Sequence, residues 1–297
     1  MSKSIVTIGL CVKDGENTLH DAIASIISQD FPHDLIEVIF VDDGSIDSSV
    51  RLIERYTPEI DISCRILSHK WRGLGASRNV VLNHANGSLI LWVDADMVLS
   101  KDYLKILVQF MEANPAVGIV KGKQSLESGA NYIATLESWS RATGRMIDYN
   151  SKKAEVKSLG TGGSMHRIAA LRQVGGFDEN LTGYGEDFDV EYRIRKAGWL
   201  LSTTDVQFSD YERGQVTWQD LWKRYFKRGS DLYEFSKKHK KLIHLYNMLP
   251  PVAFFSGILY SLKLYRIIGH KIVLLLPIQC TFKMTASCFG FLKASFK

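Results

Sequence analysis

Two carboxylates separated by one residue, Asp94 and Asp96, follow directly after an apolar run at residues 89–93. The run predicts a buried strand, so both side chains fall at a strand end. Oxygen ligands of this kind suit Mg²⁺ or Mn²⁺ and leave coordination positions open for substrate phosphates. The spacing favours a divalent-cation site, and two solvated turn residues are the alternative interpretation.

A second acidic pair, Asp42 and Asp43, ends the apolar run at residues 38–41 and is followed by Gly44 and Ser45. Such carboxylates can accept hydrogen bonds from a base N–H and from ribose hydroxyls, and Gly44 permits a sharp turn. Asp and Ser also cap helices, so a simple loop with an N-cap explains the same residues.

A third acidic group comprises GGFDE at 175–179 and GEDFD at 185–189. Glu186, Asp187 and Asp189 open a predicted helix that stops before Gly198. Acidic side chains there complement the positive end of the helix dipole. Three acids in four positions nevertheless exceed what capping requires.

A basic aromatic helix is predicted from about Thr217. Its apolar side chains at helical spacing are Trp218, Leu221, Trp222, Tyr225 and Phe226, with Lys223, Arg224, Lys227 and Arg228 between them. Guanidinium groups such as those of Arg224 and Arg228 can hold a leaving diphosphate. An amphipathic helix packed on the core or on lipid headgroups gives the same pattern, and both roles can coexist.

These residues need a scaffold, and residues 1–125 provide one by alternating strand-like and helix-like segments. The expected strands are 5–11, 38–41, 64–67 and 89–93. The alternation predicts an α/β fold with a doubly wound, mostly parallel sheet flanked by helices. Ligands bind such sheets outside the carboxyl ends of the strands, where the acidic clusters at 42–43 and 94–96 fall.

Composition and charge narrow the function classes. The four cysteines form no CxxC pair and have no zinc-ligand spacing, and no secretory signal precedes the first strand, so a reducing cytosol is expected. None of the 32 acidic residues lies after Glu234, whereas ten Lys/Arg do. Those basic residues flank apolar stretches, which is typical of a membrane surface rather than of a nucleic-acid-binding face.

The apolar stretches are residues 242–262, without a charge, and 272–292, with only Lys283 charged. Each is long enough to span a bilayer. However, Pro250 and Pro251 interrupt the first, and a double span would place Lys263, Arg266 and Lys271 on the far side, against the cytoplasmic preference of basic loops. Helices that re-enter or lie in the interface are therefore favoured over a hairpin. An extension packed on the catalytic domain is the third interpretation.

Taken in order, these motifs resemble family 2 glycosyltransferases of the GT-A fold over about residues 4–230. VKDGE at 12–16 resembles the family's first nucleotide-contacting loop, and VDDGS at 41–45 its base and ribose motif. ASRN at 76–79, with Arg78, is similar to its A-x-R-N helix start, and DAD at 94–96 to its DXD motif. GGFDE and GEDFD resemble the acceptor-side motif that supplies the catalytic base.

The resemblance implies a catalytic domain at 1–235, with a nucleotide-binding part at 1–125 and an acceptor part at 126–235, followed by membrane-associated helices at 236–297. It implies that Asp14, Glu16 and Asp43 hold the nucleoside. Asp94 would contact ribose or metal, and Asp96 would ligate the metal. Asp187 would be the general base beside Glu186. Family members often carry a His after the acceptor-side helix as a further metal or phosphate contact, and this chain has none at residues 208–213. Either Asp210 takes that place as third metal ligand or the contact is absent.

The expected function is a metal-dependent, inverting glycosyltransferase. It would move a sugar from a nucleotide-diphosphate sugar, a UDP-sugar by resemblance, to a saccharide or lipid-linked acceptor at the cytoplasmic membrane face. The main alternative is a haloacid-dehalogenase-type phosphatase, with Asp94 as nucleophile and Asp96 as acid/base. That motif normally follows the first strand, whereas three strands precede it here. A non-catalytic scaffold would have decayed acidic motifs, and a nucleotidyltransferase would have a glycine-rich loop where residues 11–16 contain only Gly15.

Overall fold

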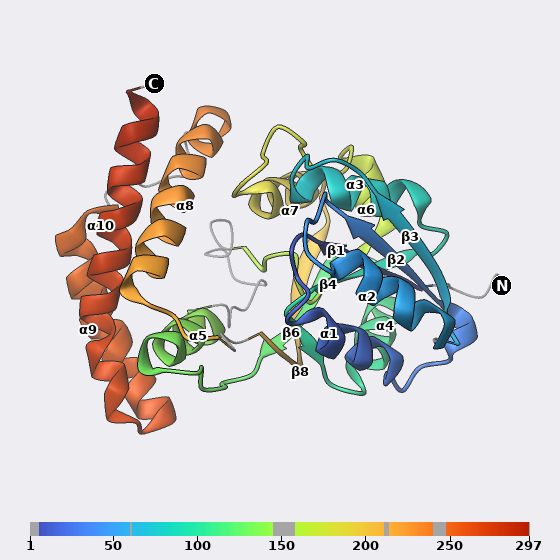
Figure 1. Ribbon diagram of the computed structural model, residues 1–297, viewed down its shortest axis with the longest axis horizontal. Coiled ribbons are helices and arrows are strands. Elements are labelled where there is room, and N and C mark those ends of the chain that lie inside the picture. The colour runs from blue at the N-terminus through green and yellow to red at the C-terminus, as the bar shows by residue number, and fades with distance from the viewer. Residues whose placement is uncertain (1–5, 60, 145–157, 211–213, 240–247, 297) are drawn as a thin grey trace. The chain divides into compact units, whose positions relative to one another are not determined.

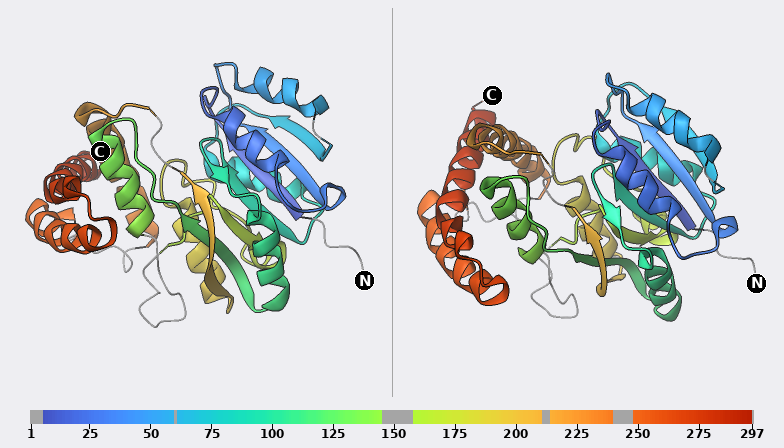
Figure 2. Two further views of the ribbon diagram at one scale, coloured as in Figure 1. Left: turned by 90° about the horizontal axis from the view of Figure 1, so that it is seen from below. Right: turned by 60° about the horizontal axis from the view of Figure 1, so that its bottom comes forward.

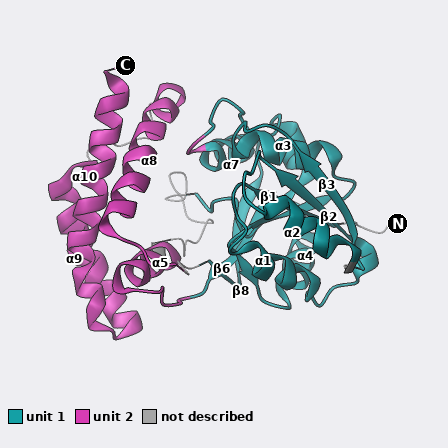
Figure 3. Cartoon of the chain, in the orientation of Figure 1, with its two compact units in different colours: residues 1–125, 145–182, 186–210 teal, residues 126–144, 183–185, 211–297 magenta. Residues whose placement is uncertain are grey.

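The computed structural model of the chain describes residues 6–59, 61–144, 158–210, 214–239 and 248–296 (Figure 1). The chain divides into two compact units (Figure 3). The first comprises residues 1–125, 145–182 and 186–210. The second comprises residues 126–144, 183–185 and 211–297.

The first unit is built on one eight-stranded sheet in the order β3-β2-β1-β4-β7-β6-β8-β5. Its parallel part consists of β1 (Val6–Val12), β2 (Ile36–Asp42), β3 (Ser63–Ser68) and β4 (Leu89–Asp94). These are the four expected strands, and the predicted α/β fold is confirmed. Most side chains of β1, β2 and β4 are apolar and buried because helices cover both faces of the sheet, whereas the edge strand β3 is partly exposed.

The other half of the sheet was not expected from the sequence. It contains β5 (Val98–Leu99), β6 (Val117–Gln124), β7 (Ser164–Arg167) and β8 (Leu200–Ser209). Strand β7 pairs antiparallel with β4 and β6, whereas β6 and β8 are parallel. Glycines and a buried Lys121 interrupt the apolar pattern of β6, and β8 carries a polar run, so neither segment resembles a buried strand in sequence.

Two apolar clusters enclose the sheet. Alternate residues of one strand point to opposite faces, so Leu91 joins one cluster and Trp92 the other. The first cluster is covered by α1 (Leu19–Ile27), α2 (Ser49–Tyr56) and α4 (Tyr103–Ala113). The second is covered by α3 (Leu74–His84), α6 (Ile168–Gln173) and α7 (Glu186–Lys196). Short 3-10 turns, η1 (His33–Leu35) and η2 (Thr57–Glu59), complete this unit.

The second unit is helical. It contains α5 (Tyr132–Gly144), α8 (Trp218–Lys238), α9 (Pro250–Ile268), the 3-10 turn η5 (Lys271–Leu275) and α10 (Leu276–Ser295). A capping box between Thr217 and Asp220 starts α8. Helix α10 packs against both α8 and α9 (Figure 2).

The compact units divide the chain elsewhere than at residue 235, and the domain boundary expected there stays a prediction. Helix α8 groups with the C-terminal helices because Leu221 and Tyr225 share an apolar cluster with Ala286 of α10. In the described part of the chain, two helical segments are long and apolar enough to cross a membrane, judged by length and composition alone. They are Pro250–Ile268 and Lys271–Ser295.

Candidate active site

The first unit brings the two acidic strand ends to one edge of the sheet. Strand β1 lies between β2 and β4, with Val12 in register with Asp42 and Cys11 with Asp94. Because all three strands are parallel, their carboxyl ends meet at this edge, where ligands of doubly wound sheets bind. The structure therefore brings the VDDGS and DAD motifs together.

The loops after β1 and β2 are tied to each other by Asp14 and Glu16. The Ile46 amide donates to Asp14 Oδ1 at 2.8 Å, and the Ser48 amide donates to Glu16 Oε2 at 2.9 Å. Asp14 has φ of 52°, a left-handed backbone that Asp tolerates better than most residues. Both carboxylates thus brace the two loops, and their contact with a nucleoside stays a prediction.

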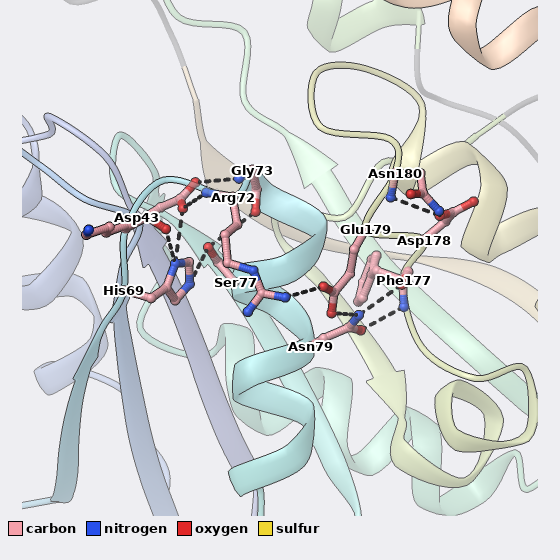
Figure 4. Close-up of polar contacts among 11 residues, drawn as sticks. Asp43, His69, Arg72, Gly73, Ser77, Asn79, Phe177, Asp178, Glu179 and Asn180 are labelled. Carbon is pink, nitrogen blue, oxygen red and sulfur yellow. Dashed lines mark hydrogen bonds and ion pairs between the residues drawn. The ribbon is translucent and has the colours of Figure 1, made fainter.

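Asp42 and Asp43 are buried and hold backbone amides. Asp42 Oδ1 accepts from the Ser45 amide at 3.1 Å, which closes the turn after β2. Asp43 accepts from the amides of Arg72 at 2.8 Å and Gly73 at 3.1 Å, and His69 Nδ1 lies 3.4 Å from Asp43 Oδ1 (Figure 4). Asp43 therefore fixes the segment that leads into α3. Its predicted nucleoside contact is untested.

The GGFDE motif docks on α3. Asn79 accepts from the Phe177 amide at 2.8 Å and donates to the Phe177 carbonyl at 2.9 Å and to Glu179 Oε1 at 3.0 Å. Arg72 pairs with the other oxygen of Glu179 (Figure 4). These contacts make the motif a brace that positions the segment ahead of α7.

Arg78 connects an acid of the DAD motif with an acid of the GEDFD motif. Its Nη1 donates to Glu186 Oε1 at 2.9 Å, and its Nη2 lies 3.8 Å from Asp94 Oδ1. The guanidinium is buried and lies over the Phe177 ring, 5.4 Å from the centroid. A charge this deeply buried requires partners, and the two carboxylates supply them.

Glu186 and Asp187 differ in environment. Burial, reinforced by the charge of Asp187 and opposed by the charge of Arg78, raises the pKa of Glu186 to about 7. Asp187 is half-buried, and its Oδ1 accepts from the Phe188 amide at 2.7 Å. Asp187 is therefore the more accessible of the two carboxylates at the start of α7.

The DAD turn presents two accessible carboxylates. The Asp94 side chain is 42% exposed and Asp96 is exposed, and the Met97 amide closes the turn onto the Asp94 carbonyl at 3.0 Å. Gly162 lies so close that a Cβ there would be 2.0 Å from Asp94 Oδ2. Two accessible oxygen donors suit a hard cation that takes its other ligands from substrate and water.

Asp210, the expected third ligand, lies one residue beyond the register pair of Val98 and Ser209, at the buried end of β8. Val98 in turn lies two residues after Asp96 of the DAD turn. Among the residues that the structure describes, however, no three His, Cys, Asp or Glu side chains converge as a metal-binding group. The role of Asp210 as a ligand remains a prediction.

A buried clamp, which the sequence did not predict, holds the loop that carries Gly162. Glu191 accepts from the amides of Leu159 at 2.9 Å and Gly160 at 2.8 Å, and Lys121 donates to the carbonyls of the same residues at 2.8 and 3.1 Å. Burial, reinforced by the charge of Asp187, raises the pKa of Glu191 to about 7. Nothing local marks these residues, because their partners lie more than 30 positions away.

Arg224 and Arg228 lie on α8 in the second unit. Arg228 donates to the Tyr184 hydroxyl at 2.6 Å and its guanidinium lies 4.4 Å from that ring centroid. Leu221 and Tyr225 are buried on the apolar face of α8, which confirms the amphipathic interpretation of this helix. The expected contact of both arginines with a diphosphate stays a prediction.

Comparison with known proteins identifies the family. A model of glycosyl transferase family 2 matches residues 7–175, more than half of the chain. The chain belongs to glycosyl transferase family 2. The family 2 match confirms the resemblance. The phosphatase alternative has no support, because Asp94 ends the fourth strand of the chain rather than the first.

Family 2 relatives share part of the sequence. Poly(ribitol-phosphate) beta-N-acetylglucosaminyltransferase TarS of Staphylococcus aureus is 32% identical over 99 residues, which cover 33% of this chain and only 17% of TarS. The succinoglycan biosynthesis protein ExoA of Rhizobium meliloti is 27% identical over 241 residues, which cover 73% of this chain and 67% of ExoA.

Solved structures share the fold. The mannosyltransferase PcManGT from Pyrobaculum calidifontis, in complex with GDP-Man and Mn²⁺, has a TM-score of 0.68 and 19% identity, over 100% of this chain and 88% of PcManGT. Residues 1–349 of S. aureus TarS, in complex with UDP-GlcNAc, have a TM-score of 0.56 and 17% identity, over 98% of this chain and 92% of that one. The family 2 chain therefore has a GT-A fold.

Proposed function

We propose that the protein is a metal-dependent, inverting glycosyltransferase that uses a nucleotide-diphosphate sugar. The observation that carries this proposal is the bridge made by Arg78, which lies against both Asp94 of the DAD turn and Glu186 at the start of α7. A site that joins a donor to an acceptor needs both kinds of carboxylate at one place. The family 2 match and the GT-A fold agree with this assignment.

Asp94 and Asp96 would hold a divalent cation, Mg²⁺ or Mn²⁺. Their exposure and the close backbone of Gly162 beside Asp94 fit a cation with few protein ligands. When bound, the cation would supply Lewis-acid neutralisation of the departing diphosphate. The complex of PcManGT with Mn²⁺ and GDP-Man supports this choice of cofactor.

Asp187 would act as general base. It would take the proton of the acceptor hydroxyl while that oxygen forms a bond to the anomeric carbon and the bond from this carbon to the diphosphate oxygen breaks. Glu186 next to it would keep the helix start in place through Arg78. A single displacement inverts the anomeric configuration.

The donor would be a UDP-sugar, held by the loops that contain Asp14, Glu16, Asp42 and Asp43. TarS in complex with UDP-GlcNAc supports uridine, whereas PcManGT in complex with GDP-Man is the precedent for guanosine. The acceptor would be a saccharide or a lipid-linked saccharide at the cytoplasmic face of a membrane. The apolar helices α9 and α10 and the basic C-terminal sequence support that location.

The test is turnover of a nucleotide-sugar panel by the full chain with Mn²⁺, read as release of nucleoside diphosphate. We expect one donor to be hydrolysed slowly and a uridine donor to be preferred. Turnover of a GDP-sugar alone would overturn the donor assignment. Release of phosphate from phosphomonoesters without any donor turnover would overturn the proposed activity.

A further inference from the structure

Helix α10 buries several polar side chains and exposes several bulky apolar ones. Gln279, Lys283 and Ser287 are buried, whereas Ile278 and Phe289 are more than half exposed. A helix at a water-facing surface shows the opposite distribution, with apolar residues toward the core. The outer side of α10 is therefore poorly suited to contact with water.

Helix α9 shows the same inversion. Its buried residues are Leu264 and three small ones, Ala253, Gly257 and Ser261. A Cβ on Gly257 would lie 2.8 Å from the Cα of Pro277, so α9 packs closely on the start of α10. Phe255, Leu259 and Leu262 are 67%, 72% and 50% exposed. Their spacing of four and three residues places them on one side of the helix, and we call these three residues the outer stripe.

Helix α10 cannot enter a bilayer core without α8. Ser287 Oγ donates to the Tyr225 carbonyl at 3.0 Å, and Ser230 Oγ of α8 donates to the Gly290 carbonyl at 3.0 Å, so the two helices are joined along α10. Helix α8 also carries exposed charged side chains, Lys223, Arg224, Lys227 and Arg228. Such charges are costly in hydrocarbon, which opposes a spanning position for the pair.

Lys283, the single charged residue within the apolar part of α10, also binds other protein groups. Lys283 Nζ donates to Glu137 Oε2 of α5 at 2.7 Å, and the Tyr225 hydroxyl donates to Glu137 Oε1 at 2.8 Å. All three side chains are buried. This network fixes α10 between α5 and α8 inside the second unit.

We propose that the outer stripe of α9 lies in the cytoplasmic interface of an anionic bilayer, and that neither α9 nor α10 crosses it. The inference rests on the membrane location in the proposed function and specifies its geometry. Exposed Lys263, Arg266 and Lys271 follow the outer stripe, and no acidic residue occurs after Glu234. This charge suits anionic headgroups, and an interfacial helix keeps the basic segment on the cytoplasmic side.

Vesicle flotation tests the outer stripe. The full chain is purified in detergent, the detergent is removed in the presence of phosphatidylglycerol/phosphatidylcholine vesicles, and the bound fraction is measured. Leu259→Glu and Phe255→Glu should each lower the partition coefficient at least about tenfold, because a carboxylate enters an apolar, anionic surface. Leu200→Glu is the matched control, since Leu200 is 52% exposed but lies on β8 in the first unit. Its partition coefficient should not change.

Cysteine labelling separates an interfacial helix from a hairpin. Cys11, Cys64, Cys280 and Cys288 are replaced by Ala, and Lys271→Cys or Lys238→Cys is added. Inside-out membrane vesicles are treated with an impermeant maleimide. We expect both cysteines to be labelled there, and neither to be labelled from outside intact cells. Labelling of Lys271→Cys only from outside would overturn the proposal in favour of a hairpin.

A second copy of the chain is the other occupant that an apolar stripe could have. The lipid assignment would be overturned if the full chain did not bind vesicles and instead formed a dimer that the Leu259→Glu substitution dissociates. Nucleotide-sugar turnover by Leu259→Glu in detergent should match that of the unchanged chain. That assay separates the two proposals: loss of membrane binding with intact turnover concerns the outer stripe, and absent turnover in both proteins concerns the transferase activity.

Discussion

Arg78 and Glu186 form a buried ion pair, 2.9 Å between Nη1 and Oε1, that joins helix α3 to the start of helix α7. The two residues are 108 positions apart in the sequence. Asp94 lies 3.8 Å from the other terminal nitrogen of the same guanidinium, so one side chain links the DAD turn to the residue next to the candidate base. The geometry of the site therefore depends on the buried charge of Arg78, which protein carboxylates stabilise in place of water.

Arg78→Leu should lower the free energy of unfolding by about 3–5 kcal/mol, because Glu186 is left buried without its partner. Urea unfolding measures the change. Arg78→Leu with Glu186→Leu should regain part of the loss, since the second change removes the unpaired carboxylate. Equal stability of the single and double variants would contradict this account.

Asp187→Asn should reduce kcat roughly 10²–10⁴-fold while leaving donor binding in place, because only proton removal is lost. Steady-state turnover and donor titration measure the two effects. Glu186→Gln is the matched neighbour and should affect stability more than proton transfer. A dead Glu186→Gln beside a nearly normal Asp187→Asn would assign the base to Glu186, and loss of donor binding in both would make the residues structural.

Asp96→Ala should abolish turnover, and a chelator should silence the unchanged enzyme until Mn²⁺ or Mg²⁺ is restored. Asp205→Ala is the control, since the Asp205 side chain is 91% exposed and pairs with Lys123 of β6. Its metal titration should match that of the unchanged chain. Full activity of metal-free enzyme would refute the cation site.

Gly162→Ala tests the contact with Asp94. Gly162 has no positive φ, so the backbone accepts Ala, but the added Cβ would be 2.0 Å from Asp94 Oδ2 and the carboxylate must move. We expect at least a tenfold higher Mn²⁺ concentration for half-maximal turnover, with little change in melting temperature. Gly214→Ala, where a Cβ meets nothing within 4 Å, should behave like the unchanged chain.

Stability should fall as the pH rises from about 5 to 8. The pKa values of Glu186 and Glu191 are raised from 4.5 to about 7 in the folded chain, so the folded state keeps protons that the unfolded chain has released. That protonation stabilises the fold below the unfolded value and is lost as the pH passes the folded value. Melting temperature against pH should be flatter for Glu191→Gln, whereas exposed Glu112→Gln should keep the original slope.

Local signals carried the prediction of strands β1 to β4 and of the acidic clusters that follow them. Strands β1, β2 and β4 each contain an apolar run, and the acidic clusters come directly after the runs in β2 and β4, so spacing alone places Asp42 and Asp94 at one sheet edge. The resemblance added roles to these positions. Those roles remain predictions, whereas the fold and the family are confirmed.

The features that the sequence did not predict depend on contacts between residues that lie far apart in the chain. Lys121 and Glu191 look like surface residues in any local window, yet both are buried because the backbone of Leu159 and Gly160 satisfies them. The grouping of α8 with α10 depends likewise on contacts between residues about 60 positions apart, such as Tyr225 and Ser287. A change in composition near Phe235 could not reveal that packing.

The buried pair of Glu137 and Lys283 has a consequence for how the chain is made. The two residues are 146 positions apart, so α5 leaves the ribosome long before its cationic partner has been synthesised. During that interval the Glu137 carboxylate and the apolar side of α8 must stay hydrated or be shielded, and the second unit closes only when α10 arrives. A chain shortened to Ser236 would lack these contacts with α10, so we expect it to be less stable than the full chain.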